Sequence, residues 1–211
     1  MTTIAVLGAG EVGRQLARAF VSLGYDVVVA NSRGPATLTG LVHELGPRAR
    51  AASVSEAAAA GDLAVLAFPY RPDHEHPAAE LAGKVVLDTN NYMAWRDGHF
   101  PDVDSGVVTV HELRQRQLPA SKVAKAFTHV QAPRLFGLSR PAGAPDRRAL
   151  VASSDHPEAV AVTRLYDEIG FDTVDNSPLS ESWRSSPGTP MWEHHVFGQD
   201  RDLLVRNLAR A

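Results

Sequence analysis

Two short segments near the start of the chain combine residue types and spacings that suit a phosphorylated ligand. The first, GAGEVG at residues 8–13, follows an apolar run and precedes a pattern typical of an amphipathic helix. In such a turn the first glycine permits a tight bend, the second lets the backbone approach a pyrophosphate at the helix N-terminus, and the third allows close packing. We therefore expect a dinucleotide to be bound by Gly8, Ala9, Gly10, Glu11, Val12 and Gly13. The alternative is a structural strand–turn–helix with incidental glycines.

The second segment, NSRGP at residues 31–35, lies where a dinucleotide-binding unit often carries a carboxylate. That carboxylate bonds the ribose 2′-hydroxyl of NAD and would repel the 2′-phosphate of NADP. This sequence has Asn31 there, followed by Ser32 and by Arg33, whose guanidinium can pair with phosphate and stack on adenine. Asp26 comes at the start of the preceding strand, away from the ligand edge. The pattern predicts NADP, unless Arg33 is simply a solvated loop arginine.

Further candidates follow other strand-like runs, because ligands of open α/β sheets lie beyond the carboxyl ends of the strands. The segment AFP, residues 67–69, could form a wall on the nicotinamide side through Phe68 and Pro69. Asp88 is expected to brace a turn rather than to do chemistry. The polar residues after it, Asn90, Asn91 and Tyr92, offer amide and phenol contacts near the same crevice.

His129 is the best-placed ionisable side chain at this edge, just past the run KAF. It could donate a hydrogen bond to a carbonyl or position a ring, which makes it the candidate catalytic and substrate-contacting residue. A packed histidine with a structural hydrogen bond is the alternative.

Other histidine clusters do not have the spacing of a metal site. The segment His74-Glu75-His76 and the pair His194-His195 lack the i, i+4 pairing of a helical zinc site, and the chain has no cysteine. No nucleophile-elbow motif of serine hydrolases occurs in the sequence either. We therefore expect no metal, and we favour hydride transfer, in which the cofactor carries most of the chemistry.

The candidate residues require a sheet whose strand ends meet at one edge, and the chain has a suitable alternation of apolar and amphipathic segments. Strands are expected at residues 4–10, 26–31, 48–54, 63–69, 84–90, 121–127, 148–153 and 171–176. Helices are expected at residues 11–23, 35–45, 55–60, 109–117, 157–169 and 201–210, and between the strands at 63–69 and 84–90. This rhythm predicts an α/β fold with a Rossmann-type, doubly wound parallel sheet. We expect an NADP-binding domain at residues 1–177 and a small C-terminal extension at 178–211 that packs on it.

The composition argues against several other classes of protein. The chain has 211 residues and a net charge of −3, so no broad basic surface is available for nucleic acid or anionic lipid. The absence of cysteine excludes disulfides and thiolate chemistry. We find neither a signal-peptide pattern nor an apolar run long enough to cross a bilayer, and we expect a cytoplasmic protein.

Six segments together resemble the NADPH-dependent deazaflavin reductases, also called F420-dependent NADP oxidoreductases. They are IAVLGAGEVGRQLA, VVVANSRGPATLTGLVHELG, KVVLDTNNY, KAFTHV, RPAGAPDRRALVASSD and ESWRSSPGTP. The resemblance covers nearly the whole chain, and NSRGP and ESWR…PGTP are its more specific parts.

The resemblance implies a Rossmann-type domain that binds NADP and passes a hydride directly to or from a deazaflavin, coenzyme F420, in an open cleft. It implies a homodimer as well. It places the pyrophosphate on Gly8 to Gly13 and the 2′-phosphate on Ser32 and Arg33. The nicotinamide end would be lined by Ala67, Phe68, Pro69, Thr89, Asn90 and the stretch from Ala126 to His129. The loop with Trp183 and the segment from Pro187 to Trp192 would face the second ring system or a dimer partner, which makes Trp183 and Trp192 substrate candidates.

Two alternatives stay open. The acceptor could be a small carbonyl, an imine or a flavin, or the protein could bind NADPH as a non-catalytic sensor. The chain differs from the common family pattern at Thr128 and His129 and in the tail MWEHHVFGQDRDLL, both at the acceptor end.

Overall fold

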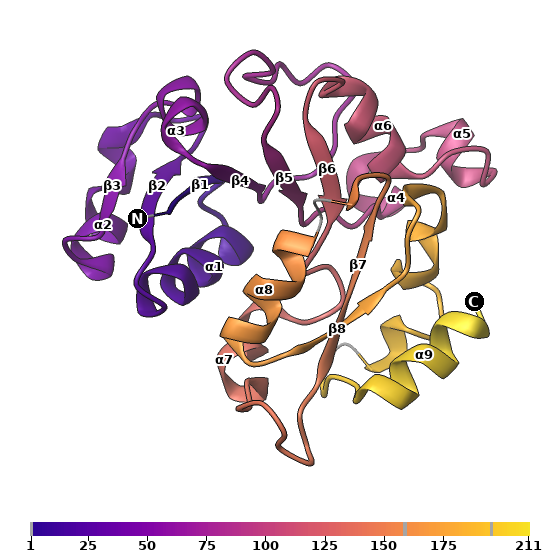
Figure 1. Cartoon of the computed structure of the whole chain (residues 1–211). Coiled ribbons are helices and arrows are strands. Elements are labelled where there is room, and N and C mark those ends of the chain that lie inside the picture. Colours follow the sequence, from indigo (N-terminus) through magenta and orange to yellow (C-terminus); the bar gives the residue numbers. More distant parts are fainter. Residues whose placement is uncertain (1, 158–159, 195) are drawn as a thin grey trace.

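The computed structural model describes residues 2–157, 160–194 and 196–211, and one eight-stranded sheet runs through it (Figure 1). The strand order is β3-β2-β1-β4-β5-β6-β7-β8. The strands are β1 Thr3–Leu7, β2 Asp26–Ala30, β3 Ala49–Ala51, β4 Leu63–Leu66, β5 Val85–Asp88, β6 Lys122–Lys125, β7 Ala149–Ser154 and β8 Asp172–Asp175. The strand order reverses between β1 and β4, as in doubly wound Rossmann-type folds, so the predicted α/β class is confirmed.

Helices follow most strands along the chain. The α-helices are α1 Glu11–Ser22, α2 Thr39–Leu45, α3 Val54–Ala60, α4 Ala94–Asp97, α5 Pro101–Asp104, α6 Val110–Gln117, α7 Leu135–Leu138, α8 Val160–Ile169 and α9 Arg201–Ala209. The 3-10 helices are η1 Pro35–Leu38, η2 Ala132–Arg134, η4 Leu179–Ser185 and η5 Trp192–His194. Capping boxes fix the starts of α3 and α6, where Ser53 pairs with Glu56 and Thr109 with Glu112.

The N-terminal half buries both faces of its sheet because alternate strand residues point to opposite layers. On one face, Ile4 and Val6 of β1 share a cluster with Leu16 and Phe20 of α1. On the other face, Ala5 and Leu7 of β1 belong to the cluster that contains the buried alanines of α3. The three layers hold the carboxyl ends of β1, β2, β4 and β5 at one edge of the sheet.

The predicted parallel sheet has one antiparallel junction. β7 runs antiparallel to β6 and pairs with it only at Ala124↔Ser154 and Lys125↔Ser153. The connection through residues 126–148, with the short helices η2 and α7, stays on the side of the sheet where β6 ends, so β7 runs back in the opposite direction. β7 and β8 are parallel to each other, and Figure 1 shows α8 and α9 on either side of this second strand pair.

The predicted helix between β4 and β5 is also wrong. Residues 67–84 form turns and coil within the described chain, and Pro69, Pro72 and Pro77 interrupt the segment. Proline lacks the N–H that a helix interior needs and disfavours helical backbone in the residue before it. The helix predicted at 157–169 is described from Val160 onward, and residues 158, 159 and 195 lie outside the described residues.

The segment η4 is tied to the sheet by three buried polar side chains. Lys125 Nζ donates to the Ser182 carbonyl oxygen at 2.7 Å, and the Thr109 hydroxyl donates to the Leu179 carbonyl oxygen at 3.1 Å. The Ser182 hydroxyl lies 3.3 Å from His111 Nδ1. The division at residue 177 stays a prediction, but η4 is bonded to β6 and α6 of the preceding domain. Within the described ranges, no helix combines the length and apolar character required to cross a membrane.

Candidate cofactor and substrate site

The glycine turn between β1 and α1 has no room for a side chain at two of its three motif glycines. Gly8 has a φ of 111°, and a Cβ there would lie 2.5 Å from the Ala67 carbonyl oxygen. A Cβ on Gly13 would lie 1.8 Å from the Gly8 carbonyl oxygen. Gly10 is the N-cap of α1 and has open space where its Cβ would be. The N-terminus of α1 is therefore accessible where the pyrophosphate is expected to bind.

A cavity of about 380 Å³ lies beside this turn at the carboxyl end of β2, and we call it the β2 cavity. Asn31 shapes its loop, because its Oδ1 accepts a hydrogen bond from the Arg33 backbone N–H at 3.0 Å and its Nδ2 lies 2.9 Å from the Thr37 hydroxyl. The side chains of Ser32 and Arg33 are left exposed. The lining consists of Leu7, Gly8, Ala9, Gly10, Asn31, Ser32, Arg33, Val54, Ala67, Phe68, Pro69 and His74.

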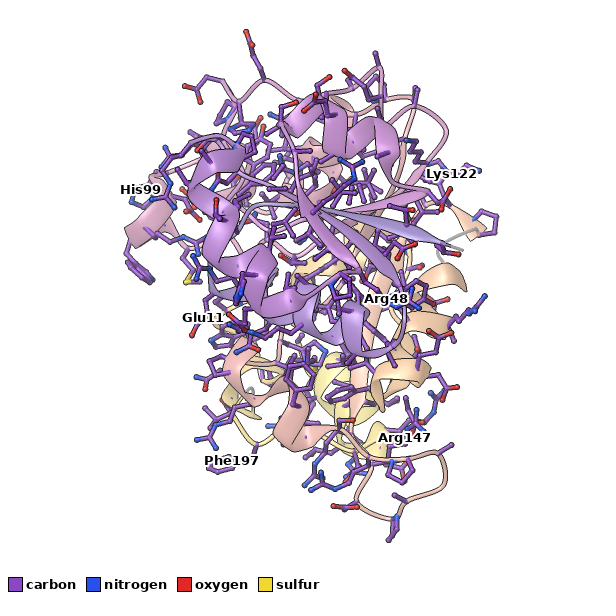
Figure 2. All side chains as sticks on the ribbon, turned by 90° about the vertical axis from the view of Figure 1, so that its left-hand side faces the viewer. Glu11, Arg48, His99, Lys122, Arg147 and Phe197 are labelled. Atoms are coloured by element: carbon purple, nitrogen blue, oxygen red, sulfur yellow. The ribbon has the colours of Figure 1, made fainter. Side chains whose placement is uncertain are left out.

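A second cavity of about 420 Å³, the central cavity, shares Ala67, Phe68 and Pro69 with the first. Its full lining is Glu11, Val12, Ala67, Phe68, Pro69, Thr89, Asn90, Asn91, Met93, Arg96, Phe127, Thr128, Val130, Gln131, Ala132, Pro133 and Trp192. Figure 2 shows Glu11 at the start of α1, at the level where the N-terminal half meets the rest of the chain. The two cavities adjoin at the end of β4, so one elongated ligand can occupy both.

Three polar atoms of residues that line the central cavity are buried and have no hydrogen-bond partner within the described residues. They are Asn90 Nδ2, Asn91 Oδ1 and Thr128 Oγ1. Asn91 is oriented by its own Nδ2, which donates to the Thr128 carbonyl oxygen. Unpaired buried polar atoms are costly unless a ligand or water pairs them. An amide donor, an amide acceptor and a hydroxyl fit the carboxamide of a nicotinamide ring.

An ion pair between Asp88 and Arg114 supports the walls of both cavities. Both side chains are fully buried, and Arg114 Nε lies 3.1 Å from Asp88 Oδ2. Asp88 Oδ1 also accepts the Asn90 backbone N–H at 3.1 Å, so the predicted bracing role of Asp88 is confirmed. The Arg114 guanidinium lies 5.1 Å from the centroid of the Phe68 ring. Its Nη1 lies 2.9 Å from His76 Nε2, and burial together with the Arg114 charge lowers the pKa of His76 to about 4.

Phe127 bends the chain beside the central cavity. Its φ of 56° lies in the left-handed region, which is uncommon for a residue other than glycine. The Phe127 backbone N–H donates to the Tyr166 hydroxyl at 2.8 Å, and that hydroxyl donates to the Val151 carbonyl oxygen at 2.9 Å. Such strain persists only where surrounding contacts impose it, and here it precedes the cavity residue Thr128.

The structure places His129, the predicted catalytic and substrate-contacting residue, apart from both cavities. The side chain is 2% exposed and is not part of the lining of either cavity. Its Nε2 accepts the Val151 backbone N–H at 2.8 Å, and burial lowers the pKa of His129 to about 3. His129 is thus a neutral ring in the core that accepts a main-chain hydrogen bond. This matches the alternative of a packed histidine with a structural hydrogen bond.

Three other predicted contacts also lie outside the two cavities. Tyr92 and Trp183 line a separate cavity of about 210 Å³, and the Tyr92 hydroxyl is bonded to Asp104. Ala126 is fully buried in the core because it continues β6 inward. Trp192 does line the central cavity, together with Thr89, Asn90 and Asn91.

Some lining residues come from segments in which the sequence pattern indicates no ligand contact. In the β2 cavity these include Val54 and His74, and in the central cavity Met93, Arg96 and Gln131. Met93 and Arg96 follow Asn91 by a few residues, so extending the predicted segment would have included them. In the part of the chain that the structure describes, no three potential metal ligands lie together.

A family model described as "NADP oxidoreductase coenzyme F420-dependent" matches residues 3–92. The matched segment contains the glycine turn, Asn31 to Arg33, and the polar residues Asn90 and Asn91. Over residues 3–92, less than half of its length, the chain is similar to this family. The match supports an NADP-dependent oxidoreductase and covers the segments in which the dinucleotide is expected to bind.

The chain is also similar to a curated protein and to solved structures, and the solved structures cover more than the matched segment. A stretch of 53 residues is 43% identical to protein YjhV of Escherichia coli K12, and it spans 25% of this chain and 39% of that protein. The solved structure of protein SMa0349 from Sinorhizobium meliloti has a TM-score of 0.69 and 29% identity, covering 94% of this chain and 92% of that one. A protein of Arthrobacter sp. FB24, assigned as an F420-dependent NADP-reductase, has a TM-score of 0.69 and 26% identity over 86% of this chain and 87% of its own.

A more distant likeness shows the fold alone. An imine reductase from Myxococcus stipitatus is 18% identical with a TM-score of 0.59. The match covers 85% of this chain but 56% of the imine reductase.

Proposed function

We propose that the protein binds NADPH across the two cavities and transfers a hydride between it and a deazaflavin, coenzyme F420, in the central cavity. The bound dinucleotide supplies the hydride. The N-terminus of α1 and the backbone of the glycine turn would bind the pyrophosphate, and Ser32 and Arg33 the 2′-phosphate. Asn90, Asn91 and Thr128 would orient the nicotinamide carboxamide, with Phe68 and Pro69 as the adjoining wall.

The observation that carries this proposal is the shortage of proton donors around the central cavity. Among its lining residues, Glu11 and Arg96 have ionisable side chains. A guanidinium keeps its proton, and Arg96 is held by Asp97 at 2.6 Å. Glu11 lies in the first turn of α1, at the helix N-terminus where the pyrophosphate is expected to bind.

An acceptor that needs no proton from the protein suits such a site. Reduction of a carbonyl or imine requires a proton on the oxygen or nitrogen, which a positioned acid normally supplies. A deazaflavin ring accepts a hydride and spreads the negative charge over its own conjugated system. The Arthrobacter relative, which covers most of this chain, is assigned as an F420-dependent NADP-reductase and supports the same acceptor.

The test is turnover with purified components. The chain is mixed with NADPH and oxidised coenzyme F420, and the loss of the visible absorbance of the oxidised ring is followed, with NADH and Arg33→Ala protein as controls. We expect rapid loss with NADPH only. Turnover of a cyclic imine or a small carbonyl in place of the deazaflavin would overturn the proposal. NADPH binding without turnover of any acceptor would indicate a sensor.

We also propose a homodimer. Large hydrophobic side chains are exposed on the single chain, including Trp95 at 83%, Val107 at 77% and Phe197 at 73%, and Figure 2 shows Phe197 at the periphery. Sedimentation of the purified chain should give twice the monomer mass, and a monomer at micromolar concentration would contradict this.

A further inference from the structure

Among the residues that line the β2 cavity, His74 from the loop between β4 and β5 has an ionisable side chain that neither motif accounts for. We propose that His74 recognises the 2′-phosphate of NADP as a hydrogen-bond donor, together with Ser32 and Arg33. This inference rests on the proposed binding of NADPH and adds a residue that determines specificity for it.

The packing of the imidazole covers one of its faces and leaves its ring nitrogens for a ligand. The His74 ring stacks on Phe68 with centroids 4.8 Å apart and an interplanar angle of 24°. It also contacts the ring of His76 at 4.8 Å. Within the described residues, the ring nitrogens of His74 have no hydrogen-bond partner. With one face packed on Phe68 the ring is held in place, and its N–H can donate to a phosphate oxygen.

His74 is exposed, but the residues on which its ring packs are held by buried contacts. Phe68 packs against the buried Arg114, which is held by Asp88 at 3.1 Å. His76, on the other side of the ring cluster, contacts the same guanidinium at 2.9 Å. A side chain held by such a support can contribute a hydrogen bond at little additional entropic cost.

The charges around His74 set its protonation. Burial and the charge of Arg114 on α6 lower the pKa of His74, and Arg71 of its own loop acts in the same direction, whereas Asp73 opposes them. His76 lies against the ring, and Arg33 belongs to the same cavity lining. The free protein therefore has a neutral imidazole at neutral pH. A bound phosphate dianion raises the pKa again, so binding takes up a proton and becomes tighter as the pH falls.

The test is calorimetric binding of 2′,5′-ADP and 5′-ADP to the full chain at about pH 6 and about pH 8, around the ordinary titration range of histidine. For the wild type we expect 2′,5′-ADP to bind at least about tenfold tighter, which corresponds to one charged hydrogen bond or more. His74→Ala should weaken the binding of 2′,5′-ADP about five- to tenfold and leave the affinity for 5′-ADP unchanged. His74→Phe keeps the ring packing on Phe68 without the N–H and should behave like the alanine variant.

The variants also separate titration from packing. His74→Gln keeps a donor that does not titrate, so its affinity for 2′,5′-ADP should change less with pH than that of the wild type. The titration of the phosphate itself is common to both proteins and cancels in this comparison. Equal losses for the two nucleotides, or wild-type affinity in His74→Phe, would overturn the inference. A wild type that does not prefer 2′,5′-ADP would contradict NADP binding itself.

Discussion

The β2 cavity and the central cavity adjoin at Phe68, yet they are built in different ways. The β2 cavity is formed largely by two runs of consecutive residues, 8–10 and 31–33, whose side chains at Ser32 and Arg33 are exposed. The central cavity combines five separated segments, 11–12, 67–69, 89–96, 127–133 and Trp192, and keeps three buried polar atoms unpaired. In the β2 cavity the side chains of Ser32 and Arg33 are exposed to water on a loop. In the central cavity the three unpaired polar atoms of the lining residues are already buried by the fold.

This difference predicts where function and stability can be separated. Exposed loop residues contribute little to folding, so their replacement should change affinity alone. Residues that support the central cavity lie beneath it, in the interior, and their replacement should destabilise the whole domain. Substitutions in the interior and on the exposed loop test this contrast.

The largest effect is expected for Asp88→Asn, beneath the central cavity. Removing the carboxylate leaves the buried Arg114 guanidinium without its partner, and breaking a buried ion pair costs about 3–5 kcal/mol. Urea denaturation measures the loss. Glu44→Gln is the matched control, because it breaks the more exposed Arg18–Glu44 pair and should cost under about 1 kcal/mol. Similar losses in the two variants would refute the special role of the buried pair.

The glycine turn provides a second pair of variants. Gly13→Ala places a Cβ against the Gly8 carbonyl oxygen and should cost about 3 kcal/mol, or roughly 6–12 °C in melting temperature. Gly10→Ala has open space in the free protein and should melt close to the wild type, but it should lose NADPH affinity because its methyl group meets the pyrophosphate. Normal NADPH binding by Gly10→Ala would place the pyrophosphate elsewhere.

The same contrast explains what the sequence can predict. The glycine turn, the missing carboxylate at Asn31 and the capped helices are local patterns, so they identify the fold class and the β2 cavity. The antiparallel β7 depends on how a loop of short helices returns to the sheet, which no local pattern specifies. His129 follows a strand end, as a ligand residue would, but the left-handed Phe127 precedes it and the ring bonds β7 instead. Only the packed chain distinguishes the two outcomes.

In the β2 cavity, Arg33→Ala should weaken the binding of NADPH by roughly 1–3 kcal/mol, which is the range for a lost charged hydrogen bond. The binding of NADH and the melting temperature should stay nearly unchanged. Arg33 is exposed, so its removal costs no packing. Calorimetry with the two dinucleotides measures the difference. A parallel loss for NADH would mean that Arg33 shapes the loop rather than reads the phosphate.

His129 should affect acid stability and not turnover. Its folded pKa is about 3 and its ordinary value 6.5, so between these values the unfolded chain binds a proton that the folded chain does not. Acid therefore destabilises the fold, by roughly 1.4 kcal/mol per pH unit below 6.5 from this residue. His129→Gln keeps an acceptor for the Val151 N–H and should lose less stability between about pH 6.5 and pH 5.5. Its pH profile of kcat/KM should match the wild type, whereas a catalytic histidine would remove one limb of that profile.

The smallest expected effect distinguishes the two cavities most directly. Thr128→Val keeps the side-chain shape and removes a hydroxyl that is unpaired in the structure, so the stability of the free protein should not fall. If the hydroxyl makes a hydrogen bond to the carboxamide, the binding of NADPH and that of NADH should both weaken by about 1 kcal/mol, because the two dinucleotides share the nicotinamide end. Arg33→Ala should affect NADPH alone. A valine variant that is less stable but binds both dinucleotides normally would assign Thr128 to the core, because its hydroxyl would then be needed by the fold rather than by the ligand.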